Sequence, residues 1–412
     1  MKIKHLIFIF LLLTLTVTLV YADDFQDVED AVERGDYKTA LEKLRPLAEQ
    51  GDAEGQYSLA LFYKYGRGVP RDSKEAVKWY RKAAEQGHAF AQKDLGLAYE
   101  DGRGIPKDHK EAANWFRKSA EQGNAAGQYR LGFSYRVGWG VTQSDKEAVK
   151  WYRKAAEQGL AYAQDSLGFA YFWGTGVPKD YKEAVKWYRK AAEQGEARAQ
   201  TSLGGMYEKG QGVPLDYKEA VKWYRKAADQ RDGEARKKLG AMYDKGQGVK
   251  QDYKEAVKWW KLAANKGWSD AQYHLGLHYH EGHGVPRDDM EAVKWWKMAA
   301  ESGNADAQHD LGVMYEKGLG VTEDYGKAEK WYTEAAKGRH ISAPFNLGTM
   351  YLQGLGVLQD DNVQAYKWYL ISASRGDIRG KEKIIILEKL LTPDQINKAG
   401  KLAMEWAVKN MW

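Results

Sequence analysis

The chain has 412 residues, of which 43 % are apolar and 13 % aromatic, enough for a well-packed interior. Its formal charge is +6; without Lys2 and Lys4, which lie in a segment expected to be removed, the 63 basic residues become 61, against 57 acidic ones. So small a surplus gives no indication of nucleic-acid binding. The absence of cysteine excludes disulfides, thiol catalysis, cysteine metal sites and lipid attachment at an N-terminal cysteine.

The first 22 residues have the pattern of a secretory signal peptide. The two lysines precede an apolar run of 15 residues, from Leu6 to Val20, and Ala22 ends a segment that resembles a cleavage site. The run is shorter than the ~20 residues that a membrane span requires. We therefore expect residues 1–22 to be a cleaved signal peptide, and the mature protein to be periplasmic or secreted without stable membrane insertion. An uncleaved anchor is the alternative.

A tryptophan recurs every 36 residues along most of the chain. A fixed period of this length is typical of a solenoid, whose units bury their apolar faces only against their neighbours. We expect these indole rings to form the repeated structural core and not to contact a ligand. Their positions are Trp79, Trp115, Trp151, Trp187, Trp223, Trp259, Trp295 and Trp331, followed after a slip of one residue by Trp368.

Each period predicts a pair of helices. The longer one is illustrated by residues 75–86, where apolar residues recur at i, i+3, i+4, i+7 and i+8 and so form one helical face. Asp72 is a suitable N-cap, and Glu75 stands three residues later, as in a capping box. Gly87 then ends the helix at a position that favours a left-handed residue.

The second helix of the pair, residues 91–100 in the same example, is predicted to be shorter. It contains Gly96, and a glycine returns at this place in every later period. Because a glycine costs a helix ~1 kcal/mol relative to alanine, its recurrence predicts an approach between helices that is too close for a side chain. A glycine-rich turn with a proline at 106 follows and ends the period.

This pattern resembles the Sel-one-like repeat (SLR) family, relatives of the tetratricopeptide repeat with a longer turn. The matching residues read Ala-Gln-x-x-Leu-Gly-x-x-Tyr-x-x-Gly-x-Gly-Val-Pro and then Asp-Tyr-x-x-Ala-x-x-Trp-Tyr-x-x-Ala-Ala-x-x-Gly. They stand nearly whole at 199–214 and 216–231, apart from Arg231 in place of the last glycine. The resemblance covers residues 52–376 as nine units. It implies an all-α solenoid, a superhelix of stacked antiparallel helix pairs that scaffolds protein–protein interactions.

Both ends of the array are expected to be caps. Residues 23–51 are predicted to form N-terminal capping helices, since Lys43 occupies the tryptophan position there. Residues 377–412 are predicted to form C-terminal capping helices, of which the last starts at Thr392 with a proline in its first position. We expect this last helix to turn a polar face outward, as a terminal repeat requires.

Aromatic residues stand beside arginines in two adjacent units, 124–159 and 160–195, at positions where other units carry charged residues. Such a composition is typical of binding hot spots. The alternative is that Trp139 and Trp173 pack on one another across adjacent turns and only stabilise the fold. The predicted partner-binding residues are Tyr129, Arg130, Arg136, Trp139, Phe172 and Trp173.

Two other patterns have a functional and a structural interpretation. His274, His278, His280 and His283 fall within ten residues, and the i, i+4 spacing of the first two can place two imidazoles on one metal, although no third ligand is set at a matching distance. The alternative is that they are packed or solvated histidines. A recurring ridge of lysines and arginines on the longer helices suits an anionic polymer, or is a solvated face balanced by neighbouring glutamates.

The sequence thus predicts an exported scaffold that binds a protein or peptide in the concave groove of its solenoid, with no catalytic residue and no cofactor. One alternative is an enzyme, because some exported cysteine-rich SLR proteins have been linked with β-lactam hydrolysis. Those proteins carry a cysteine pair in each repeat, and this chain has none. The other alternative is an envelope protein that binds a metal or a polymer through the histidines or the basic ridge.

Overall fold

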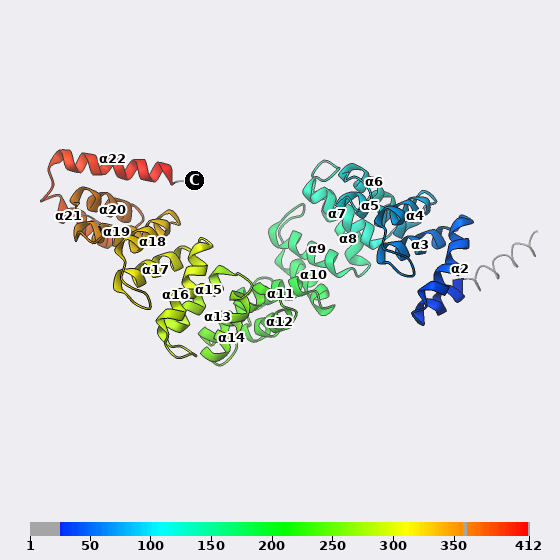
Figure 1. The fold of residues 1–412 in the computed structure, drawn as a ribbon, viewed down its shortest axis with the longest axis horizontal. Coiled ribbons are helices and arrows are strands. Elements are labelled where there is room, and N and C mark those ends of the chain that lie inside the picture. Colours follow the sequence, from blue (N-terminus) through cyan, green and yellow to red (C-terminus); the bar gives the residue numbers. More distant parts are fainter. Residues whose placement is uncertain (1–24, 357–360, 411–412) are drawn as a thin grey trace, which may run out of the picture. The chain divides into compact units, whose positions relative to one another are not determined.

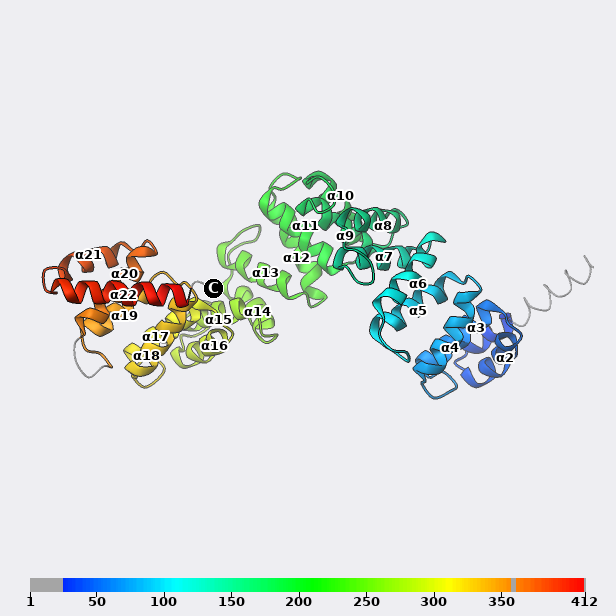
Figure 2. The same ribbon diagram turned by 90° about the horizontal axis from the view of Figure 1, so that it is seen from above.

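The computed structural model describes residues 25–356 and 361–410, so the expected signal segment 1–22 lies outside the described residues. In these two ranges every regular element is a helix, and consecutive helices pack side by side as hairpins (Figures 1 and 2). This repeat solenoid confirms the predicted all-α fold class. No helix between residues 25 and 410 that the structure describes combines the length and apolar character needed to cross a membrane.

The chain divides near residue 200 into two compact units: unit 1 holds residues up to 199 with 211–213, and unit 2 holds 200–210 and the residues from 214 onward. Unit 1 contains helical residues 25–33 and the helices α2 (Tyr37–Glu49), α3 (Ala53–Tyr65), α4 (Ser73–Glu85), α5 (Ala89–Asp101), α6 (His109–Glu121), α7 (Ala125–Val137), α8 (Asp145–Glu157), α9 (Ala161–Trp173) and α10 (Tyr181–Glu193).

Most of α11 (Ala197–Lys209) belongs to unit 2. The helices that follow in unit 2 are α12 (Tyr217–Asp229), α13 (Gly233–Lys245), α14 (Tyr253–Ala264), α15 (Ser269–Glu281), α16 (Asp289–Glu301), α17 (Ala305–Lys317), α18 (Tyr325–Lys337), α19 (Ala343–Leu352), α20 (Asn362–Ser374), α21 (Ile378–Leu387) and α22 (Pro393–Lys409). From α3 to α20, we call the odd-numbered helices A helices and the even-numbered ones B helices.

The N-caps of the B helices follow the sequence pattern, with one difference. The Asp72 carboxylate accepts hydrogen bonds from the backbone N–H groups of Lys74 and Glu75, at 2.8 and 3.1 Å, and so satisfies two of the unpaired donors at the start of α4. The side chain of Glu75 pairs with Lys78 instead of returning to the backbone of Asp72. The predicted capping box is therefore half formed, because a lysine one turn later competes for the glutamate.

The prediction of a shorter A helix is wrong. Helix α5 has 13 residues, the same number as α4. Its start is extended because the His88 imidazole accepts a hydrogen bond from Ala91 N at 3.1 Å and caps the first turn. Its end is extended because the polar residues before Gly102 remain helical until that glycine adopts a left-handed conformation, with φ of 72°. The apolar pattern marks the buried face of this helix, not its ends.

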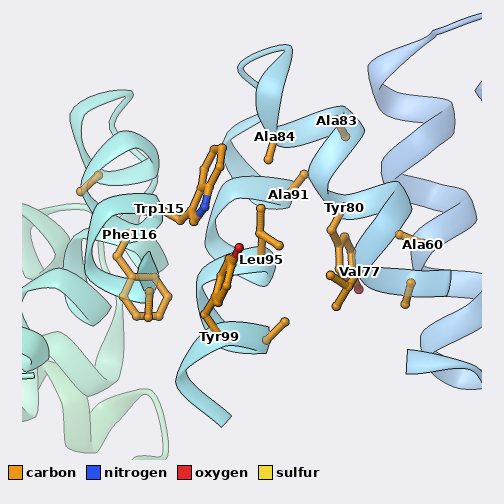
Figure 3. Close-up of a cluster of buried hydrophobic side chains, with 14 of the residues drawn as sticks. Ala60, Val77, Tyr80, Ala83, Ala84, Ala91, Leu95, Tyr99, Trp115 and Phe116 are labelled. Atoms are coloured by element: carbon orange, nitrogen blue, oxygen red, sulfur yellow. The ribbon is translucent and has the colours of Figure 1, made fainter. Parts of the chain in front are cut away.

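The most deeply buried ring of each repeat is the residue that follows the tryptophan. In α6 this is Phe116, which packs against the bare backbone at Gly96 of α5: a Cβ atom at Gly96 would lie 2.6 Å from the ring. Figure 3 shows Trp115 and Phe116 of α6 beside Leu95 and Tyr99 of α5. The missing side chain at the recurrent glycine thus leaves room for an aromatic ring of the facing helix. The equivalent rings, at most 3 % exposed, are Tyr80, Tyr152, Tyr188, Tyr224, Trp260, Trp296, Tyr332 and Tyr369.

The periodic tryptophans form the rim of the same core. Seven of the nine are 4–8 % exposed, whereas Trp79 and Trp331 are only partly buried. In several repeats a lysine one turn later lies over the outer face of the indole, as Lys118 does with its Nζ 4.0 Å from the ring centroid of Trp115. The tryptophans therefore seal the core from solvent, and the lysines cover them with a cation–π contact.

Buried glutamines connect successive repeats. Gln92 donates to the carbonyl of Ala84 at 3.0 Å and accepts from the Nε2 of Gln122 at 2.6 Å. The same pairing recurs through unit 1 and once in unit 2, and it ends where Arg236 and Lys266 replace the two glutamines. In the next repeat Ser302 stands at the donor position. There the Oε1 of Gln272 is buried and has no hydrogen-bond partner in the described chain. A side-chain ladder thus supplements apolar packing, more completely in unit 1.

Helix α22 covers the C-terminal end of the array. Thr392 and Gln395 form a full capping box at its start, and Trp406 packs edge-on against Trp368, with ring centroids 5.2 Å apart. The outer face is less polar than expected, because Val408 is largely exposed beside the lysines. A mostly apolar cleft of about 650 Å³ separates α22 from α20.

The packing of rings against glycine predicts opposite effects for two glycine substitutions within helices. At Gly168 an added methyl group would lie 2.7 Å from the ring of Tyr188, so Gly168→Ala should lower the free energy of unfolding by about 1–3 kcal/mol. At Gly400 no atom lies within 4 Å of the added Cβ, so Gly400→Ala should raise it by up to about 1 kcal/mol through helix propensity. Urea denaturation followed by circular dichroism measures both, and equal effects would contradict the packing.

Candidate functional site

Two clefts lie on the variable residues of the A helices in unit 1. The aromatic cleft has a volume of about 100 Å³ and lies between α7, α8 and α9. The basic cleft has a volume of about 430 Å³ and lies between α3, α4 and α5. The aromatic cleft is lined chiefly by Tyr129, Phe133, Arg136, Asp145, Tyr152, Asp165, Phe169 and Arg198, and the basic cleft by Lys64, Arg71, Tyr80, Asp94, Asp101, Arg103 and Arg130.

The exposed tryptophans of the predicted site adjoin the aromatic cleft. Trp139 is 39 % exposed and packs edge-on against Phe133, with centroids 5.7 Å apart, while its face stacks on His109. Trp173 is 63 % exposed and contacts Phe169 at 6.2 Å. Both phenylalanines line the cleft. The two indoles thus contact different partners, and each extends one side of the same aromatic surface into solvent.

The remaining predicted residues are divided between the two clefts. Tyr129 and Arg136 line the aromatic cleft, and Phe172 packs against Tyr181 and against the ring of the adjacent Trp173. Arg130 lines the basic cleft, where its Nη1 lies 3.3 Å from the Oε1 of Glu100. Burial raises the pKa of Glu100, and the arginine opposes that effect. Three of the six residues therefore line one cleft or the other, and the two tryptophans contact phenylalanines that line the aromatic cleft, so the six do not form one patch.

Sequence reasoning missed Phe133 and Phe169, which connect the tryptophans to the aromatic cleft. The equivalent residue of the A helix is Leu97 in the preceding repeat and Gly205 in the following repeat. Only the two repeats that carry Trp139 and Trp173 have an aromatic residue at this position. This difference between repeats was the signal that could have identified Phe133 and Phe169. A comparison of repeats position by position reveals it, whereas a search for exposed aromatics in turns does not.

Asp165 places a poorly paired carboxylate in the wall of the aromatic cleft. It is only 6 % exposed, and the nearest cation, the Nε of Arg198, lies 3.9 Å away, beyond hydrogen-bond distance. Burial raises the pKa of Asp165 to about 6, an effect that Arg198 partly offsets. By contrast, Asp94 in the basic cleft is buried but well paired, with the Tyr57 hydroxyl at 3.0 Å and the Lys93 Nζ at 2.9 Å.

The histidines of α15 do not converge. The Nε2 of His278 lies 3.0 Å from a carboxylate oxygen of Asp244, and its Nδ1 faces the backbone carbonyl of His283 at 2.9 Å. His274 stacks on Trp260, and His280 pairs with a different carboxylate. Across the residues that the structure describes, no group of three or more histidine, cysteine, aspartate or glutamate side chains is placed to hold a metal ion.

The cations of the basic ridge contact side chains of their own helix or of the adjacent helix. Lys150 and Lys186 each reach a glutamate three residues earlier, at 3.2 and 3.1 Å. Arg153 donates to the hydroxyl of Tyr171 at 2.6 Å, and Lys154 covers the ring of Trp151. Most of the ridge cations thus contribute to the outer surface of the core, as the balanced-face interpretation expects.

The pair formed by His278 and Asp244 predicts a pH-dependent contribution to stability. Burial alone would lower the pKa of His278, but the hydrogen bond and charge of Asp244 raise it above its usual value of about 6.5. The pair therefore stabilises the fold fully below about pH 6.5, and this stabilisation is lost as the pH rises through the folded-state pKa. His278→Gln should thus cost more stability at pH 6 than at pH 9.

Urea denaturation of the wild type and His278→Gln at the two pH values measures this difference. His283→Gln is the matched control, since His283 is half-exposed and pairs with the exposed Glu281. A cost of His278→Gln that grows with pH would contradict the assigned protonation.

The comparisons with known proteins agree with this geometry. The Sel1 repeat model matches nine consecutive segments, which cover most of the chain: residues 53–88, 89–124, 125–160, 161–196, 197–232, 233–268, 269–304, 305–340 and 341–377. The chain belongs to the Sel1 repeat family. Sel1 repeats are related to the tetratricopeptide repeat and generally bind protein partners, so the expected resemblance is confirmed.

Two solved Sel1 repeat structures resemble the chain over most of their length. The first, a protective antigen of uropathogenic Escherichia coli with an SLR fold, is 34 % identical and aligns with a TM-score of 0.59 over 91 % of this chain and 88 % of that one. The second, a Sel1 repeat protein from Oxalobacter formigenes, is 36 % identical, with a TM-score of 0.58 over 76 % of this chain and 90 % of that one. No significant match was found among curated proteins.

Proposed function

We propose that the protein is an exported Sel1 repeat scaffold that binds a protein or peptide partner through the A helices of unit 1. The observation that carries this proposal is the exposure of Trp139 and Trp173 on either side of the aromatic cleft. Large indole rings are costly to leave in water, and tryptophan is enriched among the residues that dominate binding energies. A partner that covers both rings removes that cost.

Each repeat has one set of residues that forms the core and another set that varies, and this separation supports a binding role. The glycine, the ring that fills it and the tryptophan recur and stay buried, whereas the two residues before each Leu-Gly pair differ from repeat to repeat. These variable positions include Tyr129, Arg130 and Asp165, which line the two clefts. The array can therefore vary its contact surface without loss of its core.

The signal-like segment supports export. Its lysines, its 15-residue apolar run and its small residue at position 22 are the features that a secretory pathway recognises. The first solved structure compared above is that of a protective antigen of uropathogenic Escherichia coli, and an exported location of this chain would place its clefts where envelope or extracellular proteins are the available partners.

A crosslinking pull-down from a bacterial envelope fraction tests the proposed site. The wild type should capture a reproducible set of proteins, and Trp139→Ala/Trp173→Ala should reduce their recovery by about tenfold or more, because each hot-spot truncation costs ~2 kcal/mol. Trp268→Ala is the matched control: this indole is 39 % exposed in unit 2, far along the chain from both clefts. Unchanged recovery with the folded double variant would refute the site.

A further inference from the structure

In unit 2 the polar atom of the core ring pairs with a carboxylate in three of the five repeats. Three rings donate to a carboxylate that stands 16 residues earlier, on the A helix of the same repeat. At Tyr224 the acceptor, Glu208, also pairs with Lys238, so that one carboxylate joins a ring hydroxyl at 2.5 Å and a cation at 3.1 Å. The three pairs are Tyr224 with Glu208, Trp260 with Asp244, and Tyr332 with Glu316.

Two repeats of unit 1 carry a cation at this position. Lys64 stands 16 residues before Tyr80, and Arg136 stands 16 residues before Tyr152. These tyrosines are 3 % and 2 % exposed, and neither hydroxyl makes a hydrogen bond with a residue in the described ranges; of the two hydroxyl oxygens, that of Tyr80 is fully buried. A buried donor without an acceptor costs about 1–3 kcal/mol, and native proteins rarely leave one unmatched.

Each unmatched hydroxyl coincides with a cleft. Tyr80 and Lys64 line the basic cleft, and Tyr152 and Arg136 line the aromatic cleft. The guanidinium of Arg136 lies over the ring of Phe133 at 5.1 Å and has no carboxylate partner in unit 1 as described. Thus, in the two repeats that carry a cation at this position of the A helix, the structure has a cleft bordered by that cation and the tyrosine.

The charge of the basic cleft favours an anion. Its wall carries four cationic side chains against two aspartates. Three of these cations already have a carboxylate partner: Lys64 lies 3.3 Å from Asp94, Arg103 lies 2.9 Å from Asp101, and Arg130 lies 3.3 Å from Glu100. Arg71 is exposed and forms no ion pair with a described residue. The aromatic cleft is closer to neutral, because Asp145 and Asp165 face Arg136 and Arg198 there. We therefore expect the basic cleft to bind an anion more strongly than the aromatic cleft.

We propose that unit 1 binds an acidic peptide, whose carboxylates occupy the basic cleft and the aromatic cleft in place of the carboxylates that these two repeats lack. A carboxylate accepts hydrogen bonds only, so it matches a tyrosine hydroxyl and a lysine or arginine at once, as Glu208 does with Tyr224 and Lys238. The clefts lie two repeats apart in the sequence, so the bound peptide is extended along the A helices. This inference rests on the proposed function and specifies the partner's chemistry.

The test uses a short, fluorescently labelled polyglutamate peptide and the purified full chain. Fluorescence anisotropy should show binding of polyglutamate and none of a polylysine peptide of the same length. Lys64→Glu should weaken binding of polyglutamate by about tenfold or more, and Arg136→Glu should weaken it by a smaller factor. Arg136→Glu places a carboxylate 16 residues before Tyr152, as in unit 2, so its unfolding midpoint should equal or exceed that of the wild type. Lys64→Glu also removes the ion pair between Lys64 and the buried Asp94, so its unfolding midpoint should be lower.

Lys74→Glu/Lys146→Glu is the matched control. These lysines are exposed on B helices of the same two repeats, and the double variant changes the charge as much as Lys64→Glu/Arg136→Glu does. The control should bind polyglutamate within about twofold of the wild type. Equal weakening by control and cleft variants, or no binding by the wild type, would overturn the proposal. If polyglutamate fails to bind while the Trp139/Trp173 dependence of capture holds, only the acidic peptide is refuted and the scaffold function stands.

Discussion

The contact between an aromatic ring and a bare glycine backbone sets the geometry of every repeat. The ring of a B helix reaches the backbone of its A helix only because no Cβ stands in the way, as at Gly96 and Phe116. This approach brings the two helices of a hairpin close enough to exclude water, and the tryptophan beside the ring then seals the rim. The glycine lowers the stability of the helix by ~1 kcal/mol, and packing around the ring contributes more to the stability of the fold than this cost.

This constraint determines which positions are free to bind. The glycine and the tryptophan recur in each repeat and the core ring is always aromatic, whereas the A-helix residues around them differ from repeat to repeat. Where such a residue is Glu208, it completes the core by accepting from Tyr224. Where it is Lys64 or Arg136, it leaves a hydroxyl unmatched and borders a cleft. A scaffold of nearly identical repeats can thus acquire a local binding surface by single substitutions at one register position.

Sequence reasoning predicted the features that periodicity encodes. The 36-residue spacing of the tryptophans and the glycine of each A helix were sufficient for the all-α repeat fold and for a close approach at Gly96. The A helix was predicted too short because its polar ends lie outside the apolar pattern. The sequence did not show that the residue after each tryptophan is the most deeply buried ring. Its type varies among Tyr, Phe and Trp, so Phe116 and Trp260 are recognised as equivalent only when the repeats are superposed.

The candidate site was predictable only in part. Exposed aromatics in the turns identified Trp139 and Trp173, but Phe133 and Phe169 lie on helices, where an aromatic residue indicates core as readily as surface. The role of Arg136 depends on a cleft that it lines together with Tyr152, 16 residues later in the sequence, and no local pattern encodes this. Pairings of this kind emerge from a comparison of equivalent positions once the hairpin geometry is known.

The central claim is that the core ring is matched internally in some repeats and left unmatched in others. The most direct measurement is the free energy of unfolding of Tyr224→Phe and of Tyr152→Phe, each relative to the wild type. Our account predicts a loss of about 1–2 kcal/mol for Tyr224→Phe, which removes the hydrogen bond from the ring hydroxyl to Glu208, and almost no loss for Tyr152→Phe. Equal losses in the two variants would contradict it.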